Sequence, residues 1–452
     1  RPQNRFCCER LLGLAPDGSL VPHLATAWEQ DPDAKTITFT LREGVKFHVG
    51  SDFDAEAVKW NMDKYIAGPN PELNNVTNVE VTGPYEVKLT CAVWDPYLIR
   101  SFMSTGAAQI VSMESAIANG DEWCKLNPVG TGPFKWVGYE TDVYIEYEAF
   151  DDYWQEGLPY LDGVRIEYVP EEAVRLASFL DDDCQIMHEL STFNARNLMD
   201  QGYWAGGRVV HMKGVAADMT KPPFDDIRIR QAMAHAFPTA AIVDAVYDGM
   251  YRSTNQLSLS GWTAYNYEME GYPYNINTAK SLLAAAGYSA SNPLQATLYY
   301  TDGAEEFYTV WADYMAAVNI NINLEPKGRR DFGPIVENPW TGLVEYQFSY
   351  NGFELTYDQS LSMTLCEDMP EYVSVVLPAE YNDLYEAMLL EEDPEAREEM
   401  YVQLNTMAID EYCLVLPMYG FEPLCAMQPY VHDCGWGTIA SEFLPEIIWL
   451  GE

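Results

Sequence analysis

The chain has 452 residues, of which 69 are acidic and 26 are basic, so its net charge is −43. An acidic surface of this kind repels nucleic acid and anionic membranes, because binding to either requires Lys and Arg side chains to neutralise phosphate. We therefore exclude nucleic acid as a partner. The length exceeds the size at which one hydrophobic core keeps growing, and it predicts two or more lobes. The sequence holds no uncharged apolar run long enough for a membrane-spanning helix.

The first hundred residues alternate between strand and helix patterns. Residues 36–41, Thr-Ile-Thr-Phe-Thr-Leu, alternate apolar and polar side chains with the period of a half-buried strand. Asp54 stands where a carboxylate would cap a helix whose apolar face includes Val58 and Met62. Residues 85–89 repeat the strand pattern.

Residues 127–134, Asn-Pro-Val-Gly-Thr-Gly-Pro-Phe, are the most distinctive stretch of the chain. The downstream Gly-Lys-Ser/Thr of a phosphate-binding loop is missing. Two glycines supply backbone torsions that other residues resist, and Pro133 fixes the exit, so the stretch predicts a tight turn that acts as a hinge. Two strands with alternating patterns are expected after it, over 143–147 and 164–168.

The second half of the chain predicts further helices between strands. Asp226 is expected to cap a helix, and a second helix over 277–286 should end at Gly287. Asp393 and Pro394 mark the start of a third. The residues expected to face inward on the first and third helices are Ile229, Ala232, Met233, Ala236, Phe237, Met400, Leu404 and Met407. Helices and strands interleave throughout, which predicts the α/β class.

No pattern of residues indicates a metal site, a cofactor or a catalytic group. The nine cysteines form no Cys-x-x-Cys pair, and the six histidines are scattered. The acidic clusters lack the ligand spacing of a calcium loop, and no Gly-x-Ser-x-Gly elbow is present. Cys413, Cys425 and Cys434 are close enough in sequence to include a disulfide, although free buried thiols are the favoured interpretation for most cysteines. We therefore expect no cofactor, no metal and no enzymatic activity.

Seven segments, in this order and at these separations, carry a resemblance to a known family. They are residues 14–29, 41–48, 128–134, 153–162, 222–232, 279–288 and 416–419. Together they resemble the extracytoplasmic solute-binding proteins of the peptide/nickel class, family 5, that serve ABC importers. The resemblance implies a two-lobe α/β periplasmic-binding-protein (Venus-flytrap) fold with an extra subdomain inserted in lobe one.

The resemblance also implies domain boundaries. Lobe one would comprise residues 1–9, 127–220 and 428–452, the inserted subdomain residues 10–126, and lobe two residues 221–427. Family members normally carry a further N-terminal strand segment and, in many bacteria, a lipid-bearing cysteine. Because Cys7 and Cys8 fall too close to the opening motif to be that cysteine, the chain is expected to be truncated at its start.

The function that the resemblance implies is capture of a small ligand by hinge closure and its delivery to the permease subunits of an ABC importer. An oligopeptide or dipeptide is the favoured ligand, and an oligosaccharide or other polar solute is the alternative. A glycosidase-type enzyme with paired carboxylates is a less favoured reading, and a chemoreceptor-coupled or adhesive protein would use the same lobes. The expected location is extracytoplasmic, as a monomeric periplasmic protein or cell-surface lipoprotein.

A candidate ligand site follows from one departure from the family pattern. Peptide-binding members carry a Gly-Trp pair followed three residues later by an Asp that pairs with the terminal ammonium of the peptide. This chain has Gly352-Phe353 with Thr356 three residues on, and Asp358 lies two positions further. Asp358 is the candidate substitute for that anchor. Aromatic residues in stretches that contain Gly, Ser, Asn and Thr have a composition suited to a cleft wall, and they add Trp262, Trp340, Phe353 and Tyr357 as candidates. The expected ligand-binding residues are these four together with Glu354, Thr356 and Asp358.

Overall fold

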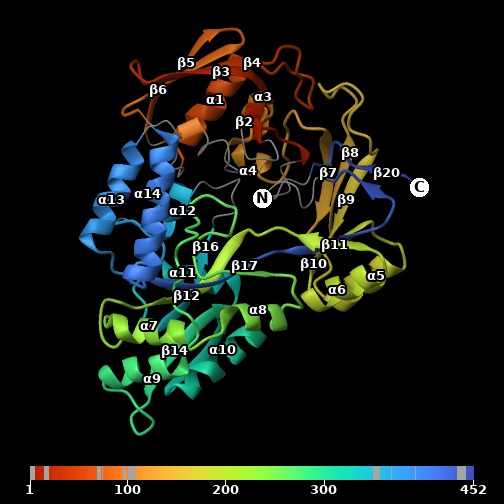
Figure 1. Cartoon of the computed structure of the whole chain (residues 1–452). Helices are drawn as coiled ribbons and strands as arrows, with labels where there is room; N and C mark the ends of the chain where they lie inside the picture. Colours follow the sequence, from red (N-terminus) through yellow and green to blue (C-terminus); the bar gives the residue numbers. More distant parts are fainter. Residues whose placement is uncertain are drawn as a thin grey trace. The chain divides into compact units, whose positions relative to one another are not determined.

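The chain folds into two compact units, drawn in Figure 1. A computed structural model describes residues 6–14, 20–68, 73, 75–94, 98–99, 108–349, 357–367, 369–391, 393–434 and 444–451. Unit 1 comprises residues 1–190, 201–205 and 425–452, and unit 2 comprises residues 191–200 and 206–424. The chain therefore passes between the units at 190/191, 200/201, 205/206 and 424/425.

Unit 1 is built mainly from small antiparallel sheets. Its strands are β1 (Leu12–Leu14), β2 (Leu20–Pro22), β3 (Ala25–Asp31), β4 (Thr36–Leu41), β5 (Val76–Gly83), β6 (Glu86–Cys91), β7 (Phe134–Glu140), β8 (Tyr144–Ala149), β9 (Gly163–Glu167), β10 (Ile186–Leu190), β19 (Val431–His432) and β20 (Trp449–Leu450). Strands β11 (Trp204–Gly207) and β18 (Leu424–Met427) each include a residue on either side of a passage. The helices are α1 (Ala55–Ile66), α3 (Met113–Asn119), α4 (Asp121–Cys124) and α5 (Glu172–Leu180).

The largest core of unit 1 lies under the four-stranded sheet of order β3-β4-β6-β5. Alternate residues of β4, such as Ile37 and Phe39, pack in this core with Val58 and Met62 of α1. Strands β7, β8 and β9 form a separate three-stranded sheet, whose smaller core contains Phe6 and Tyr147.

Unit 2 is organised around a six-stranded sheet of order β13-β17-β12-β16-β14-β15. Its strands are β12 (His211–Ala217), β13 (Arg252–Ser253), β14 (Leu294–Thr301), β15 (Ile320–Lys327), β16 (Leu343–Phe348) and β17 (Val415–Phe421). Its helices are α6 (Thr192–Asp200), α7 (Ile227–His235), α8 (Thr239–Val246), α9 (Ile276–Ala285), α10 (Glu305–Ala317), α11 (Arg329–Val336), α12 (Tyr357–Thr364), α13 (Ala379–Leu390) and α14 (Pro394–Thr406), followed by the π-helical turn η4 (Met407–Glu411).

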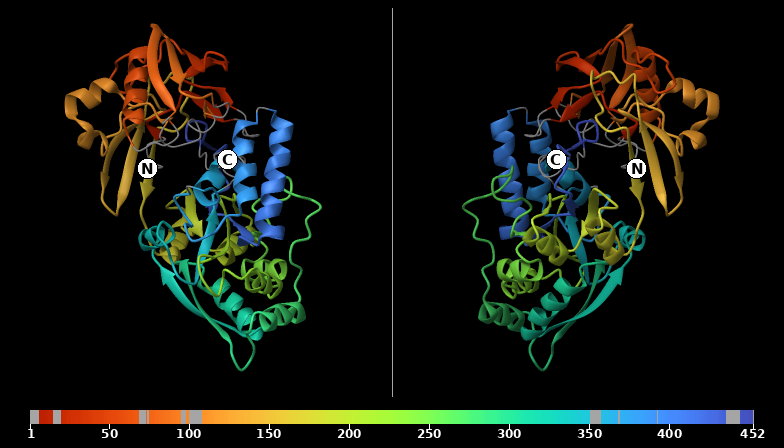
Figure 2. Two further views of the ribbon diagram at one scale, coloured as in Figure 1. Left: turned by 90° about the vertical axis from the view of Figure 1, so that its left-hand side faces the viewer. Right: turned by 90° about the vertical axis from the view of Figure 1, so that its right-hand side faces the viewer.

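Helices cover both faces of this sheet, which makes unit 2 a three-layer α/β structure. Alternate residues of β12 face opposite cores: Met212 and Ala216 pack with α11, α12, α13 and α14, whereas Val215 and Ala217 pack with α7, α8, α9 and α10. Helices α13 and α14 lie side by side, as both views in Figure 2 show. Because helices cover both faces, the inner strands β12, β16 and β17 are buried along almost their whole length, whereas the outer strand β15 is only partly buried.

Most of the local elements predicted from the sequence are confirmed. Strand β4 has the expected bounds, and the Asp54 side chain accepts a hydrogen bond from the Ala57 amide at the start of α1. Asp226 and Asp393 cap α7 and α14 in the same way. Gly287 follows α9 with a φ of +93°, the left-handed conformation that glycine adopts without strain. Capping and periodicity are local effects, so they could be read from the sequence.

The division into units differs from the expected domain boundaries. Unit 2 includes residues 191–200 and 206–220, which were expected in lobe one, and unit 1 includes residues 425–427, which were expected in lobe two. Residues 211–217 form β12, which pairs with β16 on one side and with β17 on the other. The strand is central to the sheet of unit 2, and no local pattern reveals this pairing. That residues 10–126 form a separate inserted subdomain stays a prediction.

The turn at Gly130–Pro133 was expected to be a hinge, and the structure corrects this expectation. The turn lies within unit 1, far along the chain from all four passages between the units. It packs instead on the N-terminal segment: the Gly132 amide donates to the Cys7 carbonyl at 2.8 Å. A Cβ on Gly132 would lie 2.7 Å from the backbone of Phe6 and Cys7. The glycines are needed for this close approach of two backbones.

All nine cysteines are free thiols in the structure, so Cys413, Cys425 and Cys434 form no disulfide. Seven of the nine are buried, in agreement with the favoured interpretation. Within the part of the chain that the structure describes, no helix combines the length and apolar character needed to cross a membrane.

Candidate functional site

The side of the six-stranded sheet of unit 2 at which β14, β15, β16 and β17 end is the best candidate for a ligand-contacting surface; this side is called the carboxyl-terminal edge of the sheet. Strands β14 and β15 run parallel, as do β14 and β16, and both β16 and β17 run antiparallel to β12. The last residues of β14, β15, β16 and β17 therefore lie at one edge, together with the first residue of β12. In open α/β sheets ligands bind beyond the carboxyl ends of the strands.

A buried ion pair lies just inside this edge. The Lys213 ammonium is 3.0 Å from Oε1 of Glu345, and neither side chain is more than 9% exposed. The same oxygen accepts hydrogen bonds from the Thr301 hydroxyl at 2.8 Å and from the Gln347 amide. Lys213 also lies over the Phe421 ring, 4.8 Å from its centroid. Three further groups thus support a pair that would be costly to bury alone.

His211 is two residues before Lys213 in β12, so the two side chains point to the same face of the sheet. Its Nδ1 is 3.1 Å from the Ser349 hydroxyl, and its ring stacks on Phe421. Burial, and then the positive charges of Lys213 and Arg329, lower the pKa of His211 to about 4. The imidazole is therefore neutral at physiological pH and can donate and accept one hydrogen bond each.

Asp358, the candidate ammonium anchor, lies in the first turn of α12 and is paired within unit 2. Its Oδ2 is 3.1 Å from Nη2 of Arg397, and its Oδ1 accepts a hydrogen bond from the Tyr401 hydroxyl at 3.1 Å. Burial and the Asp358 charge raise the pKa of Tyr401, so its hydroxyl stays protonated and available as a donor. Its neighbour Tyr357 is buried in the core between Phe348 and Tyr401.

The other expected site residues are spread over unit 2. The Trp262 ring lies against the Arg252 guanidinium, 5.3 Å away, and Arg252 is on the edge strand β13. Trp340 precedes the first residue of β16, at the opposite end of the sheet, and is buried against Tyr372. Phe353, Glu354 and Thr356 lie outside the described residues. Participation of all seven in ligand binding stays a prediction.

Sequence reasoning did not single out Lys213, Glu345 or His211. A signal was available, since a lysine and a glutamate interrupt otherwise apolar runs in His-Met-Lys-Gly-Val-Ala-Ala (211–217) and Leu-Val-Glu-Tyr-Gln-Phe (343–348). A charged residue in a buried strand requires a partner. Which charge pairs with which depends on strand register, and the sequence does not reveal it.

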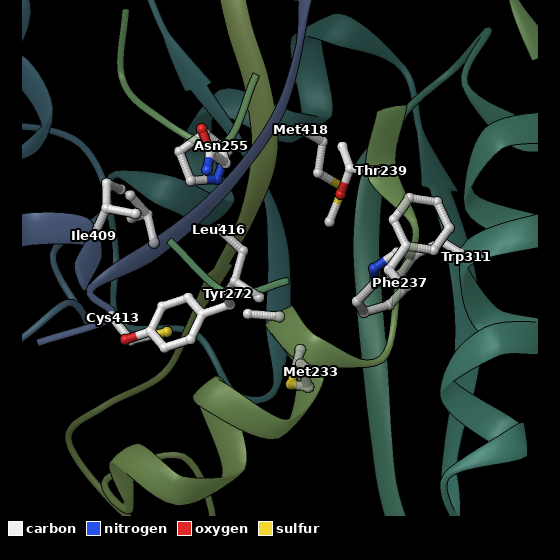
Figure 3. A pocket seen from close by; sticks show the side chains of 13 residues that line it. Met233, Phe237, Thr239, Asn255, Tyr272, Trp311, Ile409, Cys413, Leu416 and Met418 are labelled. Carbon is white, nitrogen blue, oxygen red and sulfur yellow. The ribbon is translucent and has the colours of Figure 1, made fainter. Parts of the chain in front are cut away.

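A small cavity occurs elsewhere in unit 2, between α7, α10 and β17. Figure 3 shows Phe237 and Trp311 on one side and Tyr272 and Cys413 on the other. Its volume of about 50 Å³ suffices for a few water molecules. Pockets for small organic ligands measure roughly 300–1,000 Å³, so the cavity is too small for a dipeptide. Among the described residues no three His, Cys, Asp or Glu side chains gather to hold a metal ion.

The curated relatives match about half of their own length. Heme-binding protein A of Haemophilus influenzae is 32% identical over 304 residues, 59% of this chain and 54% of that protein. The dipeptide-binding protein of Escherichia coli is 30% identical over 303 residues, 59% of this chain and 55% of that protein. A glutathione-binding protein of Salmonella paratyphi A is 29% identical over 289 residues, 62% of this chain and 55% of that protein.

Solved structures show the same fold. NikA from Brucella suis, in complex with Fe(III)-EDTA, has a TM-score of 0.89 at 19% identity and covers 99% of this chain and 95% of its own. The dipeptide-binding protein of Pseudoalteromonas in complex with Met-Leu has a TM-score of 0.84 at 20% identity, with coverages of 99% and 94%. These neighbours are two-lobe periplasmic binding proteins, which confirms the predicted fold class.

Residues 19–349, more than half of the chain, match the family described as bacterial extracellular solute-binding proteins, family 5 middle. The resemblance noted in the sequence is thereby confirmed. The chain belongs to the family 5 bacterial extracellular solute-binding proteins.

Proposed function

We propose that the chain is an extracytoplasmic solute-binding protein that captures a short peptide and delivers it to the permease subunits of an ABC importer. The family match over residues 19–349 carries this proposal. Support for the peptide comes from relatives whose names state a peptide ligand, the dipeptide-binding protein of Escherichia coli and the glutathione-binding proteins. Two structural neighbours were solved with the peptides STSA and Met-Leu. The proposed role is binding without catalysis.

The polar side chains at the carboxyl-terminal edge of the sheet in unit 2 suit a peptide ligand. Main-chain amides and carbonyls of an extended peptide need hydrogen-bonding partners of both kinds. Gln347, Ser349 and the neutral ring of His211 supply donors and acceptors there, next to the fixed charges of Lys213 and Glu345. We propose that these side chains contact the ligand. Closure of the two lobes around it, attachment to a lipid anchor and a monomeric state are predicted from the family resemblance.

The test begins with the protein purified from its source. Native mass spectrometry before and after ligand release identifies what is bound, and we expect short peptides. Calorimetric titration of the emptied protein with Ala-Phe, glutathione, maltotriose and haem then compares the ligand classes. Tightest binding of a peptide supports the proposal. Binding of maltotriose alone would leave the capture role and replace the peptide with a sugar, and turnover of any probe would contradict the binding role.

Variants at the edge of the sheet test its part in the site. His211→Asn removes the ring but keeps a hydrogen-bonding side chain, and Lys213→Met combined with Glu345→Gln removes the charge without leaving a buried carboxylate unpaired. We expect peptide affinity to fall by about tenfold for either, the effect of losing one or two hydrogen bonds. Lys280→Met, which changes an exposed lysine on α9, is the matched control. Unchanged affinity in a folded His211→Asn variant would remove this edge from the site.

A further inference from the structure

The carboxylate of Asp358 is already neutralised inside unit 2. Both of its oxygens have partners among the described residues, Arg397 on one and Tyr401 on the other, each at 3.1 Å. The side chains of Arg397 and Asp358 are 3% and 8% exposed. A protein cation therefore occupies the position where the ammonium group of a ligand would have to bind.

Arg397 is held in place by more than this pair. Its Nε donates to the Tyr401 hydroxyl at 2.9 Å, so Arg397, Tyr401 and Asp358 form a closed triangle. Its Nη1 lies 3.4 Å from the carbonyl of Leu389 and 3.3 Å from that of Glu391, at the carboxyl end of α13. A cation at this helix end is also favoured by the helix dipole. Moving Arg397 away from Asp358 would break contacts at the corner between α13 and α14.

Exchange of Arg397 for a ligand cation is unfavourable on this geometry. The guanidinium would lose its carboxylate while remaining buried, and an uncompensated buried charge is strongly destabilising. The ligand ammonium would also have to give up its hydration to reach a side chain that is nearly inaccessible.

We infer that Asp358 is a positioning residue, which fixes the start of α12 to the corner between α13 and α14 through Arg397 and Tyr401, and that it does not recognise an ammonium group. This inference rests on the proposed function and deepens it. It states that a free amino terminus is not recognised through Asp358, so that blocking the amino group has the same effect on binding with and without the Asp358 carboxylate.

The tie itself is tested without any ligand. Asp358→Asn, Arg397→Gln and the double variant form a thermodynamic cycle measured by thermal unfolding of the whole chain. We expect each single change to lower the Tm by about 4 °C or more, and the double change to lower it no further than the more severe single one. Asp383→Asn, an exposed change on α13, is the control. Additive losses would overturn the inference. Tyr401→Phe, which removes only a hydroxyl, provides the same comparison if Arg397→Gln does not fold.

Recognition is tested with the probes Ala-Phe and N-acetyl-Ala-Phe on the intact protein. We expect the ratio of the two affinities to be the same, within about threefold, in the wild type and in Asp358→Asn, and both affinities to fall in the variant. A preference of about tenfold for the free amine that disappears in Asp358→Asn would overturn the inference in favour of direct recognition. Unchanged affinities in that variant would also overturn it, because a positioning residue must affect the site. Failure of both probes to bind the wild type would count against the peptide proposal alone; the thermal cycle would still decide the tie, and the ligand released from the protein would serve as the probe.

Discussion

Two buried carboxylates, one in each unit, hold distant segments together by different means. In unit 1, Glu9 accepts hydrogen bonds from the hydroxyls of Thr131 and Tyr153, each at 2.7 Å, and from the Trp154 indole at 3.1 Å. Its only potentially cationic partner among the described residues is the His23 ring, 3.5 Å away. In unit 2, Asp358 faces the permanent charge of Arg397. The first tie is made mostly by neutral donors and the second by an ion pair.

The two ties depend on charge to different degrees. The neutral donors around Glu9 need oxygen acceptors but no net charge, so an amide at this position leaves unsatisfied only the donors that face its nitrogen. An arginine around Asp358 needs the negative charge itself, because a buried cation without its partner is strongly destabilising. The two ties should therefore respond differently to the same replacement of a carboxylate by an amide.

The largest effect is expected for Asp358→Asn. The change replaces the carboxylate that is paired with Arg397 by a neutral amide. Because Arg397 then stays buried without this negative charge, we expect the free energy of unfolding to fall by about 3–5 kcal/mol. Urea unfolding followed by fluorescence measures it, with Asp383→Asn as the control. A loss no larger than that of the control would show that the ion pair contributes nothing.

A smaller loss is expected for Gly132→Ala, which opens the contact between the turn and the N-terminal segment beside Glu9. The added methyl group would meet rigid backbone at 2.7 Å, and overpacking of this kind costs about 1–3 kcal/mol. Gly138→Ala is the matched control, since its Cβ would meet nothing within 4 Å. Equal stability of the two variants would show that the close approach is not required.

Glu9→Gln makes the same carboxylate-to-amide change in unit 1 that Asp358→Asn makes in unit 2. The amide keeps one oxygen acceptor but turns its NH₂ group toward donors, so we expect a loss of about 1–3 kcal/mol, below that of Asp358→Asn. Unfolding in urea under identical conditions ranks the two. A larger loss for Glu9→Gln would reverse the comparison and assign the stronger charge dependence to unit 1.

An effect of similar size concerns pH. Burial lowers the pKa of His48 to about 4, against a weaker opposing effect of the Gly132 carbonyl, 2.8 Å from its Nε2. In the unfolded chain the His48 imidazole binds a proton below about pH 6.5, whereas in the folded chain it becomes protonated only near pH 4. His48 therefore does not change the free energy of unfolding above about pH 6.5, and it lowers this free energy progressively as the pH falls from 6.5 to 4.

His48→Gln should remove part of that fall, about 1–3 kcal/mol, from the difference between unfolding at pH 7.5 and at pH 4.5. His235→Gln, which removes a histidine at the surface of unit 2, serves as the control. A pH dependence identical to that of the wild type in His48→Gln would exclude His48 as a source of acid sensitivity in unit 1.

The local elements and the family could be predicted from the amino-acid sequence alone. Asp54, Asp226 and Asp393 cap their helices, and β4 follows its alternation, because capping and periodicity depend only on neighbouring residues. The ordered motifs identified the family, and with it the two-lobe fold.

The roles of the Gly130–Pro133 turn, of Asp358 and of the Lys213–Glu345 pair depend on contacts between residues far apart in the sequence. The Gly130–Pro133 turn has a hinge-like composition, but the approach of residues 6–9, more than a hundred positions away, makes it a packing element. Asp358 reads as a free anchor, and Arg397, 39 positions on, neutralises it. Lys213 and Glu345 meet across 132 positions because two strands pair in one register. Long-range pairing of charges and backbones follows from the packing of distant elements, which no local pattern records.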